Sequence, residues 1–403
     1  MVGVVRKLLE RFAANGRASP KFNSSGEIDL ESLLPRPPRR IDQRAARRLL
    51  ADKRVLITGA GGTIGAELAR QAAAFEPSHL ALLDNSEFNL YLIDLELREA
   101  GLSNILYSTL TDVCRREHLD KVFKGVRPDI VLHAAAFKHV PIVEQNRCAG
   151  ALTNVLGAKN VFDAAIEAKA ESVVFISTDK AVNPTSFMGA TKRIAELYAQ
   201  ALDVAQNDTR FVTVRFGNVL GSTGSVAPLF RRQIENGGPV TVTHPEISRF
   251  FMTTREAVQL VLQAASLDSQ QKSVVTHDGR IFVLDMGEPV KILDLARRMI
   301  EAYNLSIGVD IEVKFTGLRP GEKLFEEIFL DTDKLVKTGA DGVLLASPAM
   351  IDLPLLNPRF SDVIEHALEG DQASLDDAVH HLVPEFHPTD ANGEVAKQRP
   401  LSR

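Results

Sequence analysis

The feature that most constrains this chain is a regular alternation of short apolar segments with segments of helical periodicity between residues 54 and 217. Apolar segments this short and continuous are typical of parallel strands that are buried on both faces. Helical segments between successive parallel strands must cover those two faces. The pattern predicts an α/β fold, a doubly wound parallel sheet. The apolar segments are at 54–59, 79–84, 105–108, 129–136, 172–177 and 211–217.

The chain divides into four parts by the rhythm of these segments. Residues 1–50 form an arm and a proline-rich strap; the short amphipathic stretch within 1–25 is either a frayed helix or a helix that docks on a membrane surface or a partner. Residues 51–220 hold the alternating pattern. Residues 221–350 hold shorter elements, which predict a smaller domain over the carboxyl ends of the strands with a cleft between the two. Residues 351–403 end in a tail, from Thr389, that we expect to be disordered.

Composition excludes several classes of function. With 47 Lys and Arg against 52 Asp and Glu, the net charge of −5 argues against electrostatic nucleic-acid binding. No apolar run is long enough for a membrane span, so we expect a soluble cytoplasmic protein, with the arm as the one candidate for contact with the cytoplasmic face of a membrane. Two cysteines cannot build a zinc site alone, and three histidines lack ligand spacing, so no metal is expected. The two cysteines are Cys114 and Cys148, and the three histidines are His133, His139 and His244.

A glycine-rich turn joins the first predicted strand to the first helix. Gly59, Gly62 and Gly65 have the spacing GxxGxxG, which allows a tight turn and close approach of a pyrophosphate to the helix N-terminus. Such a turn also arises from packing alone. The second strand ends in Asp84, about 19 residues past Gly65, where a carboxylate can accept from ribose hydroxyls and would repel a 2′-phosphate. The combination predicts a dinucleotide site that favours NAD over NADP.

A second polar cluster follows the strand at 172–177. Thr178, Asp179 and Lys180 come directly after it, at the edge where open α/β sheets bind ligands. Met188 and Lys192 are spaced i, i+4 and share one face of the next helix. Taken singly, a surface ion pair, a core methionine and a solvated lysine explain these residues equally well.

Several motifs together resemble the extended short-chain dehydrogenases/reductases: the glycine loop, AAAFKHVP at 134–141, STDK at 177–180 and RFGNVLGSTGSV at 215–226. More narrowly, LLPRPP at 33–38, LLDNSEFNLY at 82–91, SRFFMT at 248–253 and GLRPGEK at 317–323 resemble the UDP-N-acetylglucosamine 4,6-dehydratases of bacterial polysaccharide and glycan biosynthesis. The resemblance covers about residues 27–350 and implies a Rossmann domain with a smaller substrate domain. Many relatives carry membrane helices and another domain before this point, so we expect a short form or a soluble fragment.

The resemblance implies the following chemistry. NAD takes hydride from C4 of the sugar, the 4-ketone acidifies the C5 proton, water leaves from C5 and C6, and hydride returns to C6. Asp179 is then the acid for the leaving hydroxyl and Lys180 the base at C5, provided that burial raises the first pKa and lowers the second toward neutrality. Thr178 hydrogen-bonds the C4 oxygen, and Lys192 holds the nicotinamide ribose.

One position departs from the wider superfamily. Met188 stands where those enzymes have a catalytic tyrosine, and a methionine cannot transfer a proton. Within the dehydratase resemblance this methionine marks a subgroup associated with retained configuration at C5. A UDP-sugar 4-epimerase should have tyrosine there and has no need of the Asp179–Lys180 pair. A non-catalytic NAD-binding regulator is the other alternative, and Met188 is its best support.

The remaining predicted site residues fall into a substrate set and a cofactor set. Arg249 and Arg319 are expected on the diphosphate and Glu322 on the uridine ribose, although Glu322 could equally cap a helix. Lys138 and Asn218 are expected beside the sugar. Asp112 reaches the adenine or caps the next helix. A homo-oligomer is expected. The predicted NAD-binding residues are Gly59, Gly62, Thr63, Ile64, Gly65, Asp84, Ser86, Asp112, Ala134, Ala135, Asn154 and Lys192.

Overall fold

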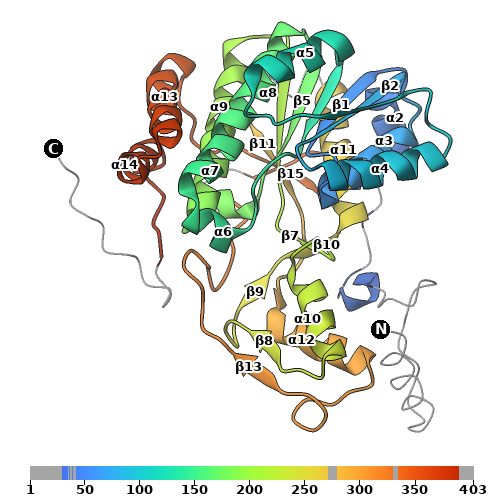
Figure 1. Cartoon of the computed structure of the whole chain (residues 1–403), viewed down its shortest axis with the longest axis vertical. Coiled ribbons are helices and arrows are strands. Elements are labelled where there is room, and N and C mark those ends of the chain that lie inside the picture. Colours follow the sequence, from blue (N-terminus) through green and yellow to red (C-terminus); the bar gives the residue numbers. More distant parts are fainter. Residues whose placement is uncertain are drawn as a thin grey trace.

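The computed structural model describes residues 30–34, 36, 39, 42–270, 279–329 and 335–389 (Figure 1). The predicted arm over residues 1–25 lies outside these ranges. So does the predicted disordered tail, apart from Thr389.

A nine-stranded sheet forms the centre of the molecule, with strand order β14-β15-β11-β6-β5-β4-β1-β2-β3. The strands from β3 to β11 are parallel, whereas at one edge β15 pairs antiparallel with β11 and β14 pairs antiparallel with β15. The strand order reverses between β1 and β4, which is where doubly wound sheets open a crevice for ligands. The predicted doubly wound α/β sheet is confirmed. The bounds are β1 (Arg54–Thr58), β2 (His79–Asp84), β3 (Leu106–Leu110), β4 (Ile130–His133), β5 (Ser172–Ile176), β6 (Arg210–Arg215), β11 (Ile281–Leu284), β14 (Val336–Lys337) and β15 (Val343–Ala346).

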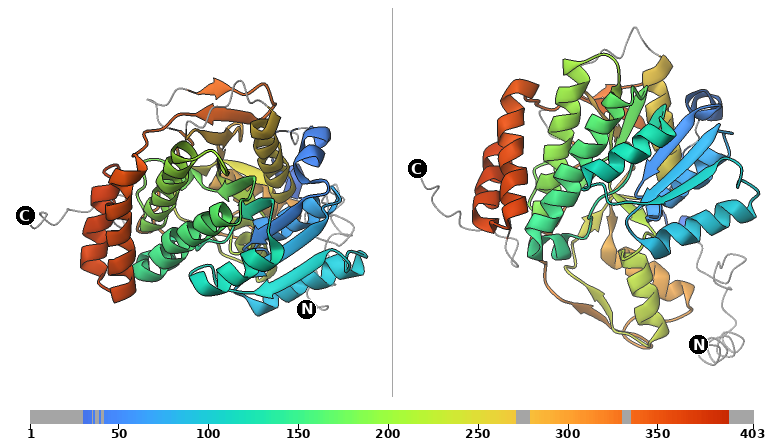
Figure 2. Two further views of the ribbon diagram at one scale, coloured as in Figure 1. Left: turned by 90° about the horizontal axis from the view of Figure 1, so that it is seen from above. Right: turned by 45° about the horizontal axis from the view of Figure 1, so that its top comes forward.

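Helices cover both faces of this sheet, as the two views of Figure 2 show. Each face has its own apolar cluster, because the strands bury side chains on both sides. One face carries α2 (Gln43–Leu50), α3 (Thr63–Ala73), α4 (Glu87–Glu99) and α11 (Thr254–Gln270). The other carries α5 (Arg116–Val126), α8 (Gly157–Glu167), α9 (Phe187–Ala205), α13 (Leu353–Glu369) and α14 (Gln372–Leu382). Between β4 and α8 run α6 (Val140–Gln145), α7 (Arg147–Ala151) and a π-helical turn, η2 (Leu152–Leu156).

A smaller lobe lies beyond the carboxyl ends of the parallel strands (Figure 1). It has a separate apolar cluster in which Phe230 and Tyr303 are buried. Its elements are η1 (Leu30–Leu33), β7 (Asn218–Leu220), α10 (Val226–Glu235), β8 (Val240–Val242), β9 (Ser248–Arg249), β10 (Phe251–Thr253), β12 (Val290–Lys291), α12 (Ile292–Ala302) and β13 (Val313–Phe315).

The chain does not stay in the small lobe after the predicted boundary at residue 220. After the first part of the small lobe, α11 and β11 return to the large sheet, and β15 later pairs with β11. The reason is that these segments are apolar on the faces they present to the sheet, so they are buried there. Residues 221–350 therefore build both lobes.

Candidate active site

Three adjoining cavities follow the carboxyl ends of the parallel strands. The first, the glycine-loop cavity, has a volume of about 190 Å³ and is lined by Gly59, Asp84 and Ser86. The second, the central cavity, has about 300 Å³ and is lined by Met188 and Lys192. The third, the outer cavity, has about 250 Å³ and faces the small lobe. Neighbouring cavities share wall residues, so the three lie side by side: Ala134, Ala136 and Phe137 for the first two, and Lys138, His139, Lys180, Asn218, Gly224, Ser225 and Val226 for the last two.

The glycine loop is packed so tightly that Gly59, Gly61 and Gly65 have no room for a side chain. Gly59 has φ +67°, and a Cβ there would lie 2.6 Å from the Ala135 nitrogen. A Cβ on Gly65 would lie 1.9 Å from the Gly59 carbonyl oxygen. The start of α3 is thereby held against the end of β1, with Gly62 and Ile64 on the cavity walls. Thr63 points elsewhere, with its hydroxyl 3.3 Å from that of Thr223.

Asp84 lies at the end of β2 with its carboxylate held in place. Its Oδ2 accepts a hydrogen bond from the Gly61 amide at 2.8 Å, and its Oδ1 accepts from the Ser86 amide at 2.8 Å. Each oxygen can accept a further hydrogen bond, and Asp84 lines the glycine-loop cavity. The Ser86 hydroxyl caps α4 by accepting from the Asn89 amide. A pair of vicinal hydroxyls would find a fixed acceptor here, so the donor and acceptor set fits a nucleoside ribose.

Two of the predicted cofactor residues bind other parts of the protein instead. Asp112 accepts from the Cys114 amide at 2.9 Å and lines none of the three cavities; it closes a turn ahead of α5, whose N-cap is Arg115, so it does not cap that helix. Asn154 is buried in the π-helical turn, where its amide both accepts from and donates to the Phe137 backbone. Its second donor reaches the Thr191 hydroxyl at 3.0 Å. Asn154 therefore positions the loop that forms the shared wall.

The segment after β5 turns into a short 3₁₀ helix, η3 (Asp179–Ala181), which buries its first residue completely. The Oδ1 of Asp179 accepts from the Thr178 hydroxyl and from the Lys180 ammonium, both at 2.9 Å. Its Oδ2 is fully buried and has no hydrogen-bond partner among the described residues. Thr178 and Lys180 line the central cavity, whereas Asp179 does not. Asp179 reaches the cavity only through these two neighbours.

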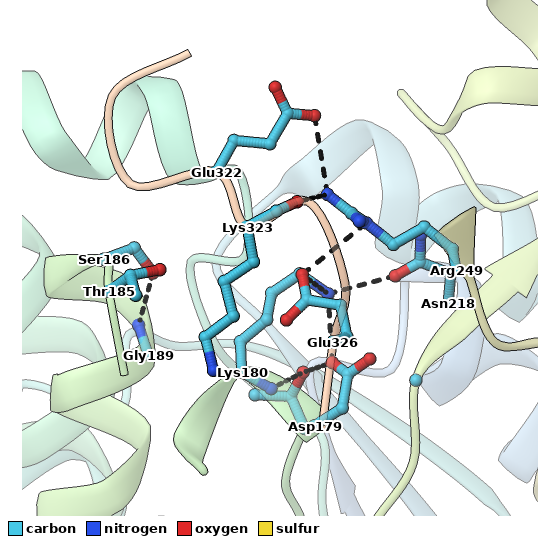
Figure 3. Close-up of polar contacts among 12 residues, drawn as sticks. Asp179, Lys180, Thr185, Ser186, Gly189, Asn218, Arg249, Glu322, Lys323 and Glu326 are labelled. Carbon is cyan, nitrogen blue, oxygen red and sulfur yellow. Dashed lines mark hydrogen bonds and ion pairs between the residues drawn. The ribbon is translucent and has the colours of Figure 1, made fainter. Parts of the chain in front are cut away.

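Lys180 is held by acceptors from three different segments (Figure 3). Its Nζ donates to Asp179 at 2.9 Å and to the Asn218 Oδ1 at 3.0 Å, and it lies 3.5 Å from the Glu326 Oε1. Burial alone would lower the pKa of Lys180, but the carboxylates of Asp179 and Glu326 outweigh it, so the pKa is raised. The condition that burial brings this pKa toward neutrality is therefore not met, because the second carboxylate, that of Glu326, comes close to Lys180 only through the fold.

Met188 and Lys192 lie on one face of α9, as predicted, and both line the central cavity. The Lys192 Nζ donates to the Ile176 carbonyl at 2.7 Å and lies 4.0 Å from the centre of the Phe175 ring. Burial lowers the pKa of Lys192 to about 7, and the Glu196 carboxylate only partly opposes this. The lysine with a pKa near neutrality is therefore Lys192.

In the outer cavity, the two predicted arginines have different surroundings. Arg249 is buried, and its guanidinium donates to the carbonyls of Ser248, Lys323 and Leu324 while lying 3.6 Å from Glu322 and 3.5 Å from Glu326. It holds the loop at 322–326. Arg319 is exposed, lines the cavity, and forms no side-chain hydrogen bond or ion pair with another described residue.

Glu322 also has partners within the protein. It accepts from the Arg319 amide at 3.1 Å and from the Thr243 hydroxyl at 3.3 Å, while its side chain still lines the outer cavity. Lys138 and Asn218, which we predicted beside the sugar, lie on the wall shared by the central and outer cavities. The structure thus gathers the predicted substrate residues around one space.

Sequence reasoning missed two residues of this site, Phe137 and Glu326. Phe137 forms part of the wall between the first two cavities. Glu326 is 3% exposed at its side chain although it carries a charge. The available signal was the acidic pair at 326–327 inside the otherwise apolar stretch 324–329, although the pattern does not say which of the two glutamates is buried.

A sequence model of a family described as "Polysaccharide biosynthesis protein" matches residues 55–348. The chain belongs to this polysaccharide biosynthesis family. Among its relatives, the capsular polysaccharide biosynthesis protein CapD of Staphylococcus aureus is 47% identical over 309 residues, which are 76% of this chain and 50% of CapD. The chain thus spans about half the length of CapD.

Two further relatives have different activities in their names. The UDP-N-acetylglucosamine 4,6-dehydratase (inverting) of Campylobacter jejuni is 32% identical, over 74% of this chain and 84% of that protein. The UDP-glucose 4-epimerase of Rickettsia akari is 35% identical, over 71% of this chain and 80% of that protein. Overall identity therefore does not choose between dehydration and epimerisation.

Solved structures support the same fold. Pen from Bacillus thuringiensis is 31% identical with a TM-score of 0.65, and the match covers 74% of this chain and 89% of Pen. The dTDP-glucose 4,6-dehydratase DesIV of Streptomyces venezuelae, solved with NAD and DAU bound, is 20% identical with a TM-score of 0.56, over 68% of this chain and 88% of DesIV. At 20% identity the second likeness concerns the fold alone.

Proposed function

We propose that this member of the polysaccharide biosynthesis family is an NAD-dependent 4,6-dehydratase. It converts UDP-N-acetylglucosamine to UDP-2-acetamido-2,6-dideoxy-4-keto-hexose. The observation that carries the proposal is the position of Lys180 on the wall shared by the central and outer cavities. A proton-transfer group would therefore lie between a cofactor bound in the glycine-loop and central cavities and a sugar bound in the outer cavity beside Arg319.

The glycine-loop and central cavities fit NAD by the chemistry of their walls. Gly59 and Gly65 leave room only for backbone, so the amides at the start of α3 can approach a pyrophosphate. Asp84 accepts from the ribose hydroxyls and disfavours a 2′-phosphate. Lys192 holds the nicotinamide ribose. When bound, NAD supplies the hydride acceptor for C4 and the hydride donor for C6.

The C4 hydroxyl needs a route for its proton, since Met188 cannot take one. Thr178 has that route, because its hydroxyl donates to the Asp179 Oδ1 at 2.9 Å. As Thr178 accepts the C4 proton it passes its own to Asp179, and the resulting carboxylic acid can protonate the leaving C6 hydroxyl through the same path. Lys192, with its pKa lowered to about 7, stabilises negative charge on the C4 oxygen whenever it is protonated.

Lys180 is the base at C5, once its ammonium has given up one proton. We infer retention at C5, since one amine takes the proton and returns it from the same side. The Campylobacter jejuni relative is named inverting, so the stereochemistry needs its own test. Running the reaction in deuterated water should give a C5-deuterated product of gluco-type configuration by NMR. The inverted C5 epimer as first product would refute retention and leave the dehydratase proposal standing.

A 4-epimerase is the second candidate, supported by the Rickettsia akari relative. Incubating the protein with UDP-N-acetylglucosamine and measuring the mass of the product separates the two activities. We expect loss of one water. A product of unchanged mass with inverted C4 would establish the epimerase instead, and unchanged substrate after loading with NAD would leave only the non-catalytic alternative.

A further inference from the structure

Glu326 is a buried carboxylate that the proposed reaction does not yet use. Its side chain is 3% exposed, and its Oε1 lies 3.5 Å from the Lys180 Nζ and 3.5 Å from the Arg249 Nε. Its Oε2 is fully buried without a hydrogen-bond partner among the described residues. An unpartnered carboxylate oxygen in a buried position is costly, so it is expected to have a function or a transient partner.

The ammonium of Lys180 has three protons and three acceptors around it. Asp179, Asn218 and Glu326 come from η3, from β7 and from the loop at 322–326 (Figure 3). Arg249 ties Glu326 to the small lobe through carbonyls of the same loop. The amine therefore has all three acceptors only when the loop at 322–326 lies against the catalytic segment.

An ammonium cannot act as a base, so Lys180 must lose a proton before it takes one from C5. Asn218 offers an amide oxygen, which does not accept a proton at ordinary pH. In the proposed reaction Asp179 already receives the C4 proton by way of Thr178. Among the three acceptors, Glu326 is the one left with a free carboxylate.

We propose that Glu326 is a positioning residue that aligns Lys180 and takes its proton during the elimination. This inference rests on the proposed function. The ammonium gives one proton to Glu326, leaving a neutral amine and a carboxylic acid. The amine then takes the C5 proton, the C5–H electron pair forms the C5–C6 double bond, and the C6–O bond breaks with a proton from Asp179 to release water.

The same groups return to their starting state at the end of the cycle. As hydride adds to C6, Lys180 gives its new proton back to C5, and Glu326 then returns the stored proton to the amine. The proton that leaves with water is the one that Asp179 received from the C4 hydroxyl by way of Thr178, so Asp179 ends as a carboxylate again. The net change in the substrate is the loss of one water.

The test compares Glu326→Gln with Glu327→Gln, a control that makes the same change one residue along the loop. Glu327 is half exposed, and its polar partners among the described residues are Lys323 and Asn183 at the surface, so this control should keep wild-type turnover. Glu326→Gln keeps the length of the side chain but cannot take a proton. We expect kcat to fall about 10²-fold near pH 7 with a much smaller change in KM. We also expect the lost rate to return as the pH rises, because hydroxide and solvent then deprotonate Lys180.

A merely structural role predicts a loss that does not recover with pH, and that outcome would overturn the proposal. So would wild-type kcat in the Glu326→Gln variant. If Glu326→Gln shows no cooperative thermal transition, Glu326→Asp takes its place as the test variant. It retains the charge but retracts the carboxylate by one methylene. It should show a smaller version of the same pH-dependent loss, and a wild-type pH profile would contradict the role.

A second measurement separates this inference from the proposed function. Lysines can be labelled by reductive ¹³C-methylation and titrated by NMR, with Lys180→Met identifying the Lys180 signal. Removing the Glu326 charge should lower the Lys180 titration midpoint, and Glu327→Gln should leave it unchanged. If the wild type releases no water from UDP-N-acetylglucosamine but this midpoint moves, the reaction is wrong and the contact stands. An unmoved midpoint would overturn the inference whatever the activity.

Discussion

At the residue scale, the hydroxyl of Thr178 makes two contacts that matter for the proposed reaction. Its hydroxyl lines the central cavity and also donates to the buried Asp179 at 2.9 Å. Thr178→Val keeps the shape but breaks this path, so we expect dehydration to fall about 10²–10⁴-fold. Met188→Leu retains an apolar side chain of similar volume and should keep most of the activity. Initial rates of the two variants, with NAD content measured in both, test the assignment; equal rates would contradict it.

Asp84 and Asp112 allow a matched comparison of two carboxylates that follow neighbouring strands. The Asp84 carboxylate faces the glycine-loop cavity, whereas Asp112 caps a turn outside it. Asp84→Ala should weaken NAD binding by about 1–3 kcal/mol through loss of the ribose acceptor. Asp112→Ala should leave the NAD affinity unchanged. Calorimetric titration of the nucleotide-stripped variants gives both values, and an unchanged affinity in Asp84→Ala would remove its role.

Lys192 makes the stability of the fold depend on pH. Burial lowers its pKa to about 7 in the folded protein, whereas a lysine in the unfolded chain titrates near 10.4. Between these values the unfolded state binds more protons, so the free energy of unfolding rises with pH. We expect this rise between about pH 7 and pH 9 to be smaller in Lys192→Met than in the wild type. Urea titrations of the NAD-free proteins test it, and parallel curves would show that the lysine keeps an ordinary pKa.

At the scale of elements, helix α9 and the catalytic segment touch backbone to backbone at Gly189. A Cβ there would lie 2.2 Å from the Lys180 carbonyl oxygen. We expect Gly189→Ala to lower the free energy of unfolding by about 1–3 kcal/mol and to shift Lys180 away from its acceptors. Gly125 in α5 has no atom within 4 Å of an added Cβ, so Gly125→Ala should be neutral or stabilising by up to about 1 kcal/mol. Chemical unfolding of both variants compares them; similar losses would contradict the close contact.

The strands and helices of the large sheet were predictable because their signals are local. Each strand is a short apolar segment. Helix α9 is preceded by the N-cap residue Ser186, whose hydroxyl accepts a hydrogen bond from the Gly189 amide at 3.1 Å. Glu326 was not predictable in this way. Its neighbours Lys180 and Arg249 lie far away in the sequence and meet it only through the fold. The pKa of Lys180 was misjudged for the same reason.

At the scale of the whole molecule, the proline-rich strap is joined to the large sheet's helices. Arg36 donates to both carboxylate oxygens of Glu256 at 2.6 and 3.3 Å, and that carboxylate is 1% exposed on α11. The strap was predicted as part of residues 1–50 without a named partner, because no pattern in a sequence identifies a partner 220 residues away.

Arg36→Ala should lower the free energy of unfolding by about 1–3 kcal/mol, since it deprives a buried carboxylate of its cation. The ion pair between Arg47 and Glu76 is more than half exposed on both sides. Arg47→Ala should therefore cost no more than about 1 kcal/mol. Urea unfolding at low and high salt provides the measurement. A loss in Arg36→Ala that is as small and as salt-sensitive as in Arg47→Ala would show that the strap contributes little to the fold.

The wall shared by the central and outer cavities has a consequence for inhibitor chemistry. Lys138, Lys180 and Asn218 border both cavities, so in the proposed reaction a nicotinamide in one cavity and a hexose in the other would lie against the same side chains. A single compound that joins the two moieties with a short linker would occupy both spaces at once. Its second half would bind at an effective concentration in the millimolar range or above, so its affinity should exceed that of either half by orders of magnitude.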